Sequence, residues 1–102
     1  MLNRLSIMDK DIHKAVNALR TALQPGHSGS VMVVLDGIGA LSVQDGVVST
    51  GPCQADCTLT ASTQTFRALL LGTLSPERAY LTGALRIDGS FAAAMTFGRH
   101  LT

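Results

Sequence analysis

Apolar residues recur at helical spacing near the start of the chain. Behind a capping-box pattern at Ser6 and Asp9 they follow three- and four-residue steps, at Ile12, Ala15, Val16, Leu19 and Leu23. Polar residues fill the opposite face, so the helix is predicted to cover a core on one side only. It is expected to end at Pro25-Gly26, with His13 pairing with Asp9 one turn earlier.

Short apolar runs replace this pattern between residues 30 and 50. The runs Val31 to Leu35, Ile38 to Val43 and Val47 to Thr50 are separated by Asp36-Gly37 and Asp45-Gly46. Asp-Gly between apolar runs favours a type I′ hairpin turn, which needs positive φ at both central residues. The segment therefore predicts a three-stranded antiparallel meander, with its first strand the most buried.

Residues 56 to 61 alternate between polar and apolar side chains, as in a half-exposed strand with Cys57, Leu59 and Ala61 inward. Ser62 is placed to cap a second helix that ends at Gly72. Ser75-Pro76 is typical of the start of a short third helix.

A fifth strand is predicted with Leu85 and Ile87 inward, followed by a last helix that Ser90 caps and that carries Phe91 and Met95. Thr96 and Gly98 weaken the end of this helix, which suggests a mobile lid. About twenty helical residues separate the fourth and fifth strands, so a crossover is expected and the sheet should be mixed. The predicted fold is α/β of the α+β type: one domain over residues 1–102, with a five-stranded mixed sheet and helices on one face.

Composition narrows the function. The 102 residues are 46% apolar and 15% charged, with a formal net charge of +1. Disorder is therefore excluded, and no basic cluster favours nucleic acid or an anionic membrane face. The longest apolar runs fall far short of the roughly 20 residues that span a bilayer, and no secretory h-region is present. A cytoplasmic protein is expected, with no bridge between Cys53 and Cys57.

Three patterns of enzymes and metal sites are present only in part. Residues 26–30 approach a nucleophile elbow around Ser28, but Ser30 replaces the final glycine and no strand precedes them. Gly37-Ile38-Gly39 lacks the last glycine of the dinucleotide motif. The cysteines and histidines match no zinc spacing. The sequence therefore predicts no catalysis, no cofactor and no metal.

An ordered set of residues in the second half of the chain carries a family resemblance. It comprises Ala55 to Thr60, Phe66, and the run from Gly72 through Leu74, Pro76, Ala79, Gly83, Leu85 and Ile87 to Gly89-Ser90. This succession resembles the sterol carrier protein type 2 domain, a family of small lipid-binding and lipid-transfer domains. The resemblance implies a hydrophobic tunnel between the sheet and the helices. Ala84 and Ser90 stand where many members have Lys and Asp; Ser90 can still cap a helix, whereas the missing Lys removes a charge near the fifth strand.

The candidate lining of that tunnel is a set of apolar side chains, together with Tyr80, whose phenol needs a hydrogen-bond partner if buried. It consists of Ile12, Val16, Leu19, Phe66, Leu69, Leu70, Tyr80, Leu81, Leu85, Ile87, Phe91 and Met95. Alanines at positions 79 and 92–94 are expected to leave unfilled volume among them. The alternative reading is that these side chains form an ordinary core, with Tyr80 at its edge and Arg86 solvated.

Two functions follow from these readings. The first is a carrier that holds an apolar lipid-like ligand, such as a fatty acyl chain, an isoprenoid, a quinone or a sterol. The second is an accessory interaction module with a solid core, which serves a partner enzyme of lipid or quinone metabolism. Burial of methylenes discriminates poorly between apolar molecules, so the ligand stays open, as does the oligomeric state.

Overall fold

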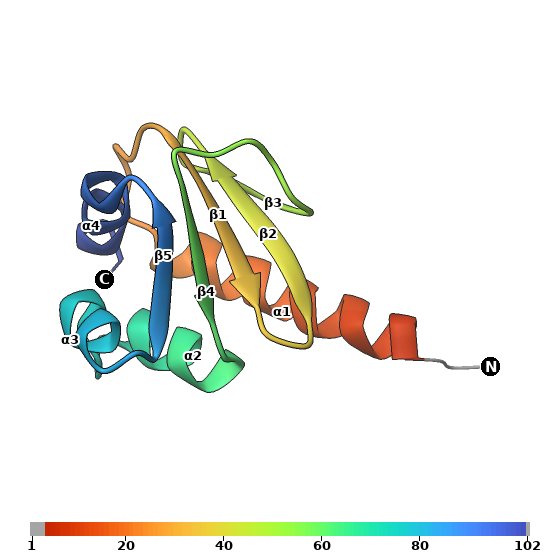
Figure 1. The fold of residues 1–102 in the computed structure, drawn as a ribbon. Coiled ribbons are helices and arrows are strands. Elements are labelled where there is room, and N and C mark those ends of the chain that lie inside the picture. The colour runs from red at the N-terminus through yellow and green to blue at the C-terminus, as the bar shows by residue number, and fades with distance from the viewer. Residues whose placement is uncertain (1–3, 102) are drawn as a thin grey trace.

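The computed structural model describes residues 4–101, with side chains described from residue 11 onward. Figure 1 shows the elements along the chain. They are α1 (Arg4–Ala22), β1 (Ser30–Leu35), β2 (Gly39–Gln44), β3 (Val47–Thr50), β4 (Cys57–Ala61), α2 (Thr63–Leu71), α3 (Pro76–Leu81), β5 (Leu85–Gly89) and α4 (Phe91–Arg99).

The first helix differs from its prediction at both ends. It begins at Arg4, so Ser6 lies within the helix and is not its N-cap. The expected pairing of Asp9 with His13 falls outside the described side chains. The helix ends at Ala22, before Pro25, and Leu23 then forms a β-bridge with Leu101.

The sheet is five-stranded and mixed, as predicted, in the order β3-β2-β1-β4-β5. Its parallel pair is β1 and β4, whereas the other neighbours are antiparallel. The crossover was expected between the fourth and fifth strands. That detail is wrong, because α2 and α3 together reverse the chain and return β5 antiparallel to β4. The long connection required by a parallel pair is supplied by β2, β3 and the loop after them.

The two Asp-Gly turns of the meander differ in conformation. Asp45 and Gly46 have φ of 49° and 84°, as a type I′ turn requires. At the other turn, Leu35 pairs with Gly39 around a three-residue loop, and among its residues only Gly37 has a φ in the left-handed range, at 74°. The prediction of a type I′ turn is therefore wrong there, since one more residue enters the loop.

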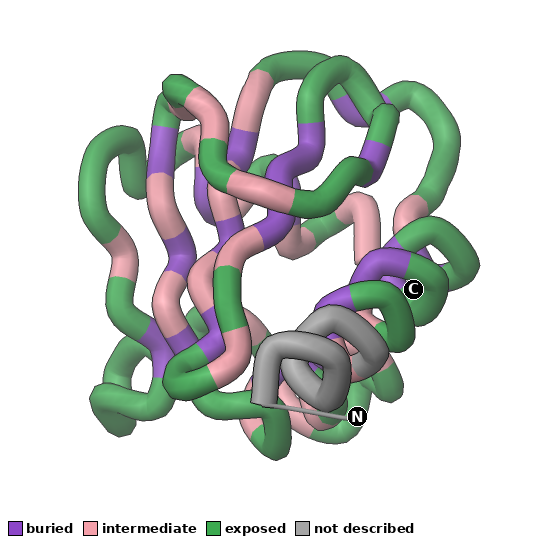
Figure 2. Tube along the Cα trace, turned by 90° about the vertical axis from the view of Figure 1, so that its right-hand side faces the viewer, coloured by how far each residue is buried: buried purple, intermediate pink, exposed green. Residues whose placement is uncertain are grey.

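One face of the sheet is covered by helices. Side chains of β1 and β4 alternate between buried and half-buried along each strand, so the two faces differ. α1 packs on β2 and β3, whereas α4 packs on β4, β1 and β5. Figure 2 shows the buried positions of the strands and of the helices facing one another across this layer. The core is therefore one layer between the sheet and the helices.

Serine caps begin the short helices as predicted. The Oγ atoms of Ser62, Ser75 and Ser90 accept hydrogen bonds from the backbone N–H groups three residues on, at 3.1, 3.2 and 3.1 Å. Gly72, at φ 76°, ends α2. These local contacts fix where each helix starts.

The buried face of α4 differs from its prediction. Ala94 and Phe97 are buried, whereas Phe91 is 47% exposed and Met95 is half-buried. Gly98 packs on α3, because a Cβ at this position would lie 2.7 Å from Pro76 Cγ. Close packing therefore accounts for this glycine, and the mobile lid stays a prediction.

Candidate functional site

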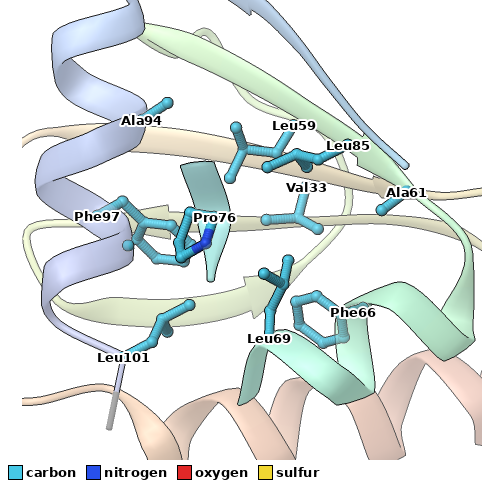
Figure 3. Close-up of a pocket in the computed structure, with 11 residues that line it drawn as sticks. Val33, Leu59, Ala61, Phe66, Leu69, Pro76, Leu85, Ala94, Phe97 and Leu101 are labelled. Carbon is cyan, nitrogen blue, oxygen red and sulfur yellow. The ribbon is translucent and has the colours of Figure 1, made fainter. Parts of the chain in front are cut away.

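A small apolar cavity lies between the sheet and the helices (Figure 3). Its volume is about 20 Å³. One water needs roughly 10–15 Å³, so this cavity is far too small for a lipid. Its walls come from β1, β4, β5, α2, α4 and the first residue of α3, and they consist of Val33, Leu59, Ala61, Phe66, Leu69, Pro76, Leu85, Ala94, Phe97, Gly98 and Leu101.

A larger hollow, of about 300 Å³, is lined by α1, α2 and the end of β1; we call it the α1–α2 groove. Ligand sites commonly measure roughly 300–1,000 Å³. The apolar part of its lining is Ala15, Ala18, Leu35, Ile38, Phe66 and Leu70. The polar part is Asp11, Lys14, Thr63 and Arg67. The groove thus offers both a hydrocarbon surface and charged groups.

The polar part of the groove has a positive balance. Lys14, Arg67 and Thr63 are exposed and Asp11 is half-buried. Neither cation has a hydrogen bond or ion pair within residues 11–101. Among the described lining residues, two cations therefore face one carboxylate, and both are available to an anionic group of a ligand.

Phe66 belongs to both hollows. It lines the small cavity and also lines the α1–α2 groove. Its side chain is buried, and Figure 3 shows its ring on α2 at the end of the cavity nearest α1. An aromatic ring therefore lies between the larger hollow and the smaller one.

The residues expected in the tunnel fall into three groups. Phe66, Leu69, Leu70 and Leu85 line one or both hollows. Ile12, Val16 and Leu19 project from α1 into the core and are buried there. Ile87 and Met95 are half-buried and pack against the same core. Tyr80, Leu81 and Phe91 are in neither lining and are exposed, Leu81 by 81%. The rings of Tyr80 and Phe91 meet edge to face with centroids 5.1 Å apart.

Several groove residues were not among the candidates. The most informative are Ala15 and Ala18, which lie three residues apart on α1 and leave room beside Leu35 and Ile38. Of the alanines expected to leave space, one lies beside a hollow. Ala79 is fully buried in the core, Ala92 is exposed, and Ala94 lines the small cavity.

A buried histidine packs against the last turns of α4. His27 is 6% exposed, its ring contacts Phe97 edge to face at 5.4 Å, and its Nδ1 has no partner among the described residues. Burial lowers the pKa of His27 below its usual value of 6.5, and His100 lowers it further, while Asp45 acts in the opposite direction. Sequence reasoning considered His27 only as a metal ligand and missed this packing role.

The other candidate groups lie apart from the hollows. Ser28 is exposed in the loop before β1, and Cys53 and Cys57 are free thiols. Across the described side chains, no three His, Cys, Asp or Glu residues gather as metal ligands. Residues 4–101 contain no helix long and apolar enough to cross a membrane.

Solved structures share this arrangement of sheet and helices. Sterol carrier protein 2 like 2 from Aedes aegypti superimposes with a TM-score of 0.68 at 18% identity, over 92% of this chain and 96% of that one. The same mosquito protein in palmitated form gives a TM-score of 0.62 at 19% identity, over 86% and 88%. The UbiJ-SCP2 ubiquinone synthesis protein gives 0.66 at 15% identity, over 91% and 94%.

A larger protein contains the same fold as one part. The sec-alkylsulfatase Pisa1 from Pseudomonas sp. matches with a TM-score of 0.65 at 21% identity, over 81% of this chain. The match spans only 15% of the sulfatase. At these identities the similarity establishes the fold alone.

Sequence comparison gives the family. No curated protein matches the chain. The family model for the SCP-2 sterol transfer family matches residues 2–102, nearly the whole sequence. The chain therefore belongs to the SCP-2 sterol transfer family.

Proposed function

We propose that the protein binds one amphiphile with a hydrocarbon tail in the α1–α2 groove and carries it without chemical change. The observation that carries the proposal is the groove itself, of about 300 Å³, with an apolar part and two cations that have no partner among residues 11–101. Family membership supports a lipid ligand. The palmitated mosquito relative supports a fatty acid as the first ligand to test.

The chemistry of the groove favours an anionic head group. The tail would lie against Leu35, Ile38 and Leu70, where each methylene removed from water contributes about 0.8 kcal/mol. The head would lie at Lys14 and Arg67, which are exposed and attract a carboxylate at modest strength. Tail burial therefore supplies most of the affinity, and the cations supply orientation.

Carriage rather than catalysis is part of the same proposal. The described polar side chains of the groove carry a hydroxyl, two cations and one carboxylate, which suit the holding of a head group. A cytoplasmic setting is also proposed, because both cysteines are free thiols.

A second candidate is an accessory module that serves a partner enzyme of lipid or quinone metabolism. The exposed rings of Tyr80 and Phe91, which contact each other, favour it, because large apolar side chains gathered on a surface often mark contacts with proteins. The fold also occurs as a small part of an alkylsulfatase and in a ubiquinone synthesis protein. This candidate needs no ligand in the groove.

Native mass spectrometry of freshly purified protein separates the two candidates. A stoichiometric adduct, extracted and found to be an anionic single-chain lipid, is expected for the carrier. A bare mass that persists after incubation with palmitate, a quinone and a sterol would contradict the carrier and favour the accessory module.

A further inference from the structure

One side chain is shared by the α1–α2 groove and the small core cavity. Phe66 is 6% exposed, lies on α2 one turn before Leu69 and Leu70, and lines both hollows. Its neighbours divide between them, because Leu70 lines the groove and Leu69 lines the cavity. Movement of this one ring would therefore join the two spaces.

The helix that carries Phe66 is anchored at both ends. Ser62 caps its start, with Thr65 N–H donating to Ser62 Oγ at 3.1 Å, and Gly72 ends it in the left-handed conformation. An anchored helix holds the Cα of Phe66 in place. The ring therefore moves by changing rotamer and not by displacement of the backbone.

The space beyond the ring suits a hydrocarbon. The cavity walls include Ala61, Leu69, Leu85 and Ala94, and each of them is apolar. No polar group of this lining would lose a partner when a chain enters, so entry carries no desolvation cost. The cavity is nevertheless only about 20 Å³, so a tail gains room there only as Phe66 vacates its own place.

We propose that Phe66 determines the length of the hydrocarbon chain that the groove accepts. With the ring in its present position the tail ends against it; with the ring displaced or shortened, the tail continues into the core. This inference rests on the proposed function, since it concerns the same groove.

The experiment compares binding of saturated fatty acids from octanoate to stearate by wild type, Phe66→Ala and Phe66→Leu. Wild-type affinity is expected to rise with each methylene and then to level off. The affinity of both variants should level off at longer chains than that of wild type. Each further methylene buried should raise the affinity roughly fourfold. Phe66→Leu keeps a core-sized side chain and tests the proposal if the alanine variant does not fold.

Two controls locate the effect at Phe66. Phe97→Leu enlarges the cavity from a wall that the groove does not share, and should leave the chain length at which affinity levels off unchanged. Ala94→Val fills the cavity and should cancel the gain when combined with Phe66→Leu.

The outcomes separate this inference from the proposed function. Binding by wild type with a length profile that superimposes on those of folded Phe66 variants would overturn the role of Phe66 and leave the carrier intact. An equal shift in Phe97→Leu would also overturn it. Failure of wild type to bind any chain would overturn the carrier itself.

Discussion

The imidazole rings of His27 and His100 meet edge to face, with centroids 5.3 Å apart and an interplanar angle of 74°. His100 Nδ1 lies 2.9 Å from the Thr96 carbonyl oxygen, whereas His27 Nδ1 is buried with no partner among the described residues. The groups that act on His27 are His100 from the end of α4 and Asp45 from the β2–β3 turn. The pair joins the loop after α1 to the last turn of α4.

Stability should fall as the pH drops below the ordinary histidine value. Burial first, and then His100, lower the pKa of His27 from 6.5 in the folded protein. The unfolded chain then binds more protons than the folded one between that lowered pKa and 6.5, so the free energy of unfolding rises with pH in this window. Thermal unfolding from about pH 7 down to about pH 5 measures it.

One variant checks the source of this dependence. His27→Phe keeps a ring against Phe97 and should flatten the pH dependence. Equal slopes in wild type and His27→Phe would show that another group is responsible.

Gly98→Ala should destabilise the protein, although alanine is the better helix former by about 1 kcal/mol. The new Cβ would lie 2.7 Å from Pro76 Cγ and 3.2 Å from Pro76 Cβ, so α3 and α4 must separate. A loss of roughly 1–3 kcal/mol is expected in chemical denaturation. The double variant with Pro76→Ala should recover part of the loss, and a stabilising Gly98→Ala would refute the close contact.

Leu70→Arg should abolish lipid uptake, because it places a charge in the apolar lining of the α1–α2 groove. The matched control is Leu71→Arg, one residue further along α2, where the side chain is 69% exposed and outside the groove lining. Both variants are compared by native mass spectrometry after incubation with palmitate. Equal uptake by folded Leu70→Arg and wild type would remove the groove as the binding site.

Lys14→Gln and Arg67→Gln should weaken binding of a fatty acid more than binding of the alcohol of equal chain length. Exposed cations interact with a carboxylate by about 1 kcal/mol or less, so a loss of two- to fivefold per variant is expected. Binding titrations at low and high salt measure this loss, since salt screens the attraction between the cations and the carboxylate. Parallel losses for acid and alcohol would place the head group elsewhere.

The two thiols should react at different rates. Burial raises the pKa of the Cys57 thiol, Asp56 raises it further, and the side chain is 1% exposed. Cys53 is only half-buried. Because the thiolate is the reactive form, a thiol reagent should label Cys53 in the native protein and Cys57 only after denaturation. Serine substitution of each cysteine shows which thiol reacts fast and which reacts slowly. Rapid labelling of native Cys53→Ser would contradict the burial of Cys57.

Local chemistry was the predictable part of this fold. A serine cap, an Asp-Gly turn or the alternation over 57–61 depends on residues a few positions apart, so the sequence displays it. The parallel pairing of β1 with β4 depends on segments far apart in the chain. Its prediction succeeded only in outline, as a mixed sheet assigned to the wrong pair of strands.

The lining residues show the same limit at the level of side chains. In α4 the sequence Phe-Ala-Ala-Ala-Met-Thr-Phe is apolar nearly all round, so periodicity does not select Phe97 over Phe91 as the buried ring. The α1–α2 groove needs Ala15 on one helix to face Leu70 on another. The local sequence of either helix does not determine which residue of the other helix it will face.

The position of β1 between β2 and β4 sets an order of events during folding. The β1–β3 meander closes through short-range contacts and forms early, but it leaves one edge of β1 without a partner until residues 57–61 arrive. That edge belongs to Val-Met-Val-Val-Leu, a sequence with high β-propensity and no charge. Refolding from denaturant should therefore be the stage at which this protein aggregates most readily, in proportion to the time for which that strand edge stays open.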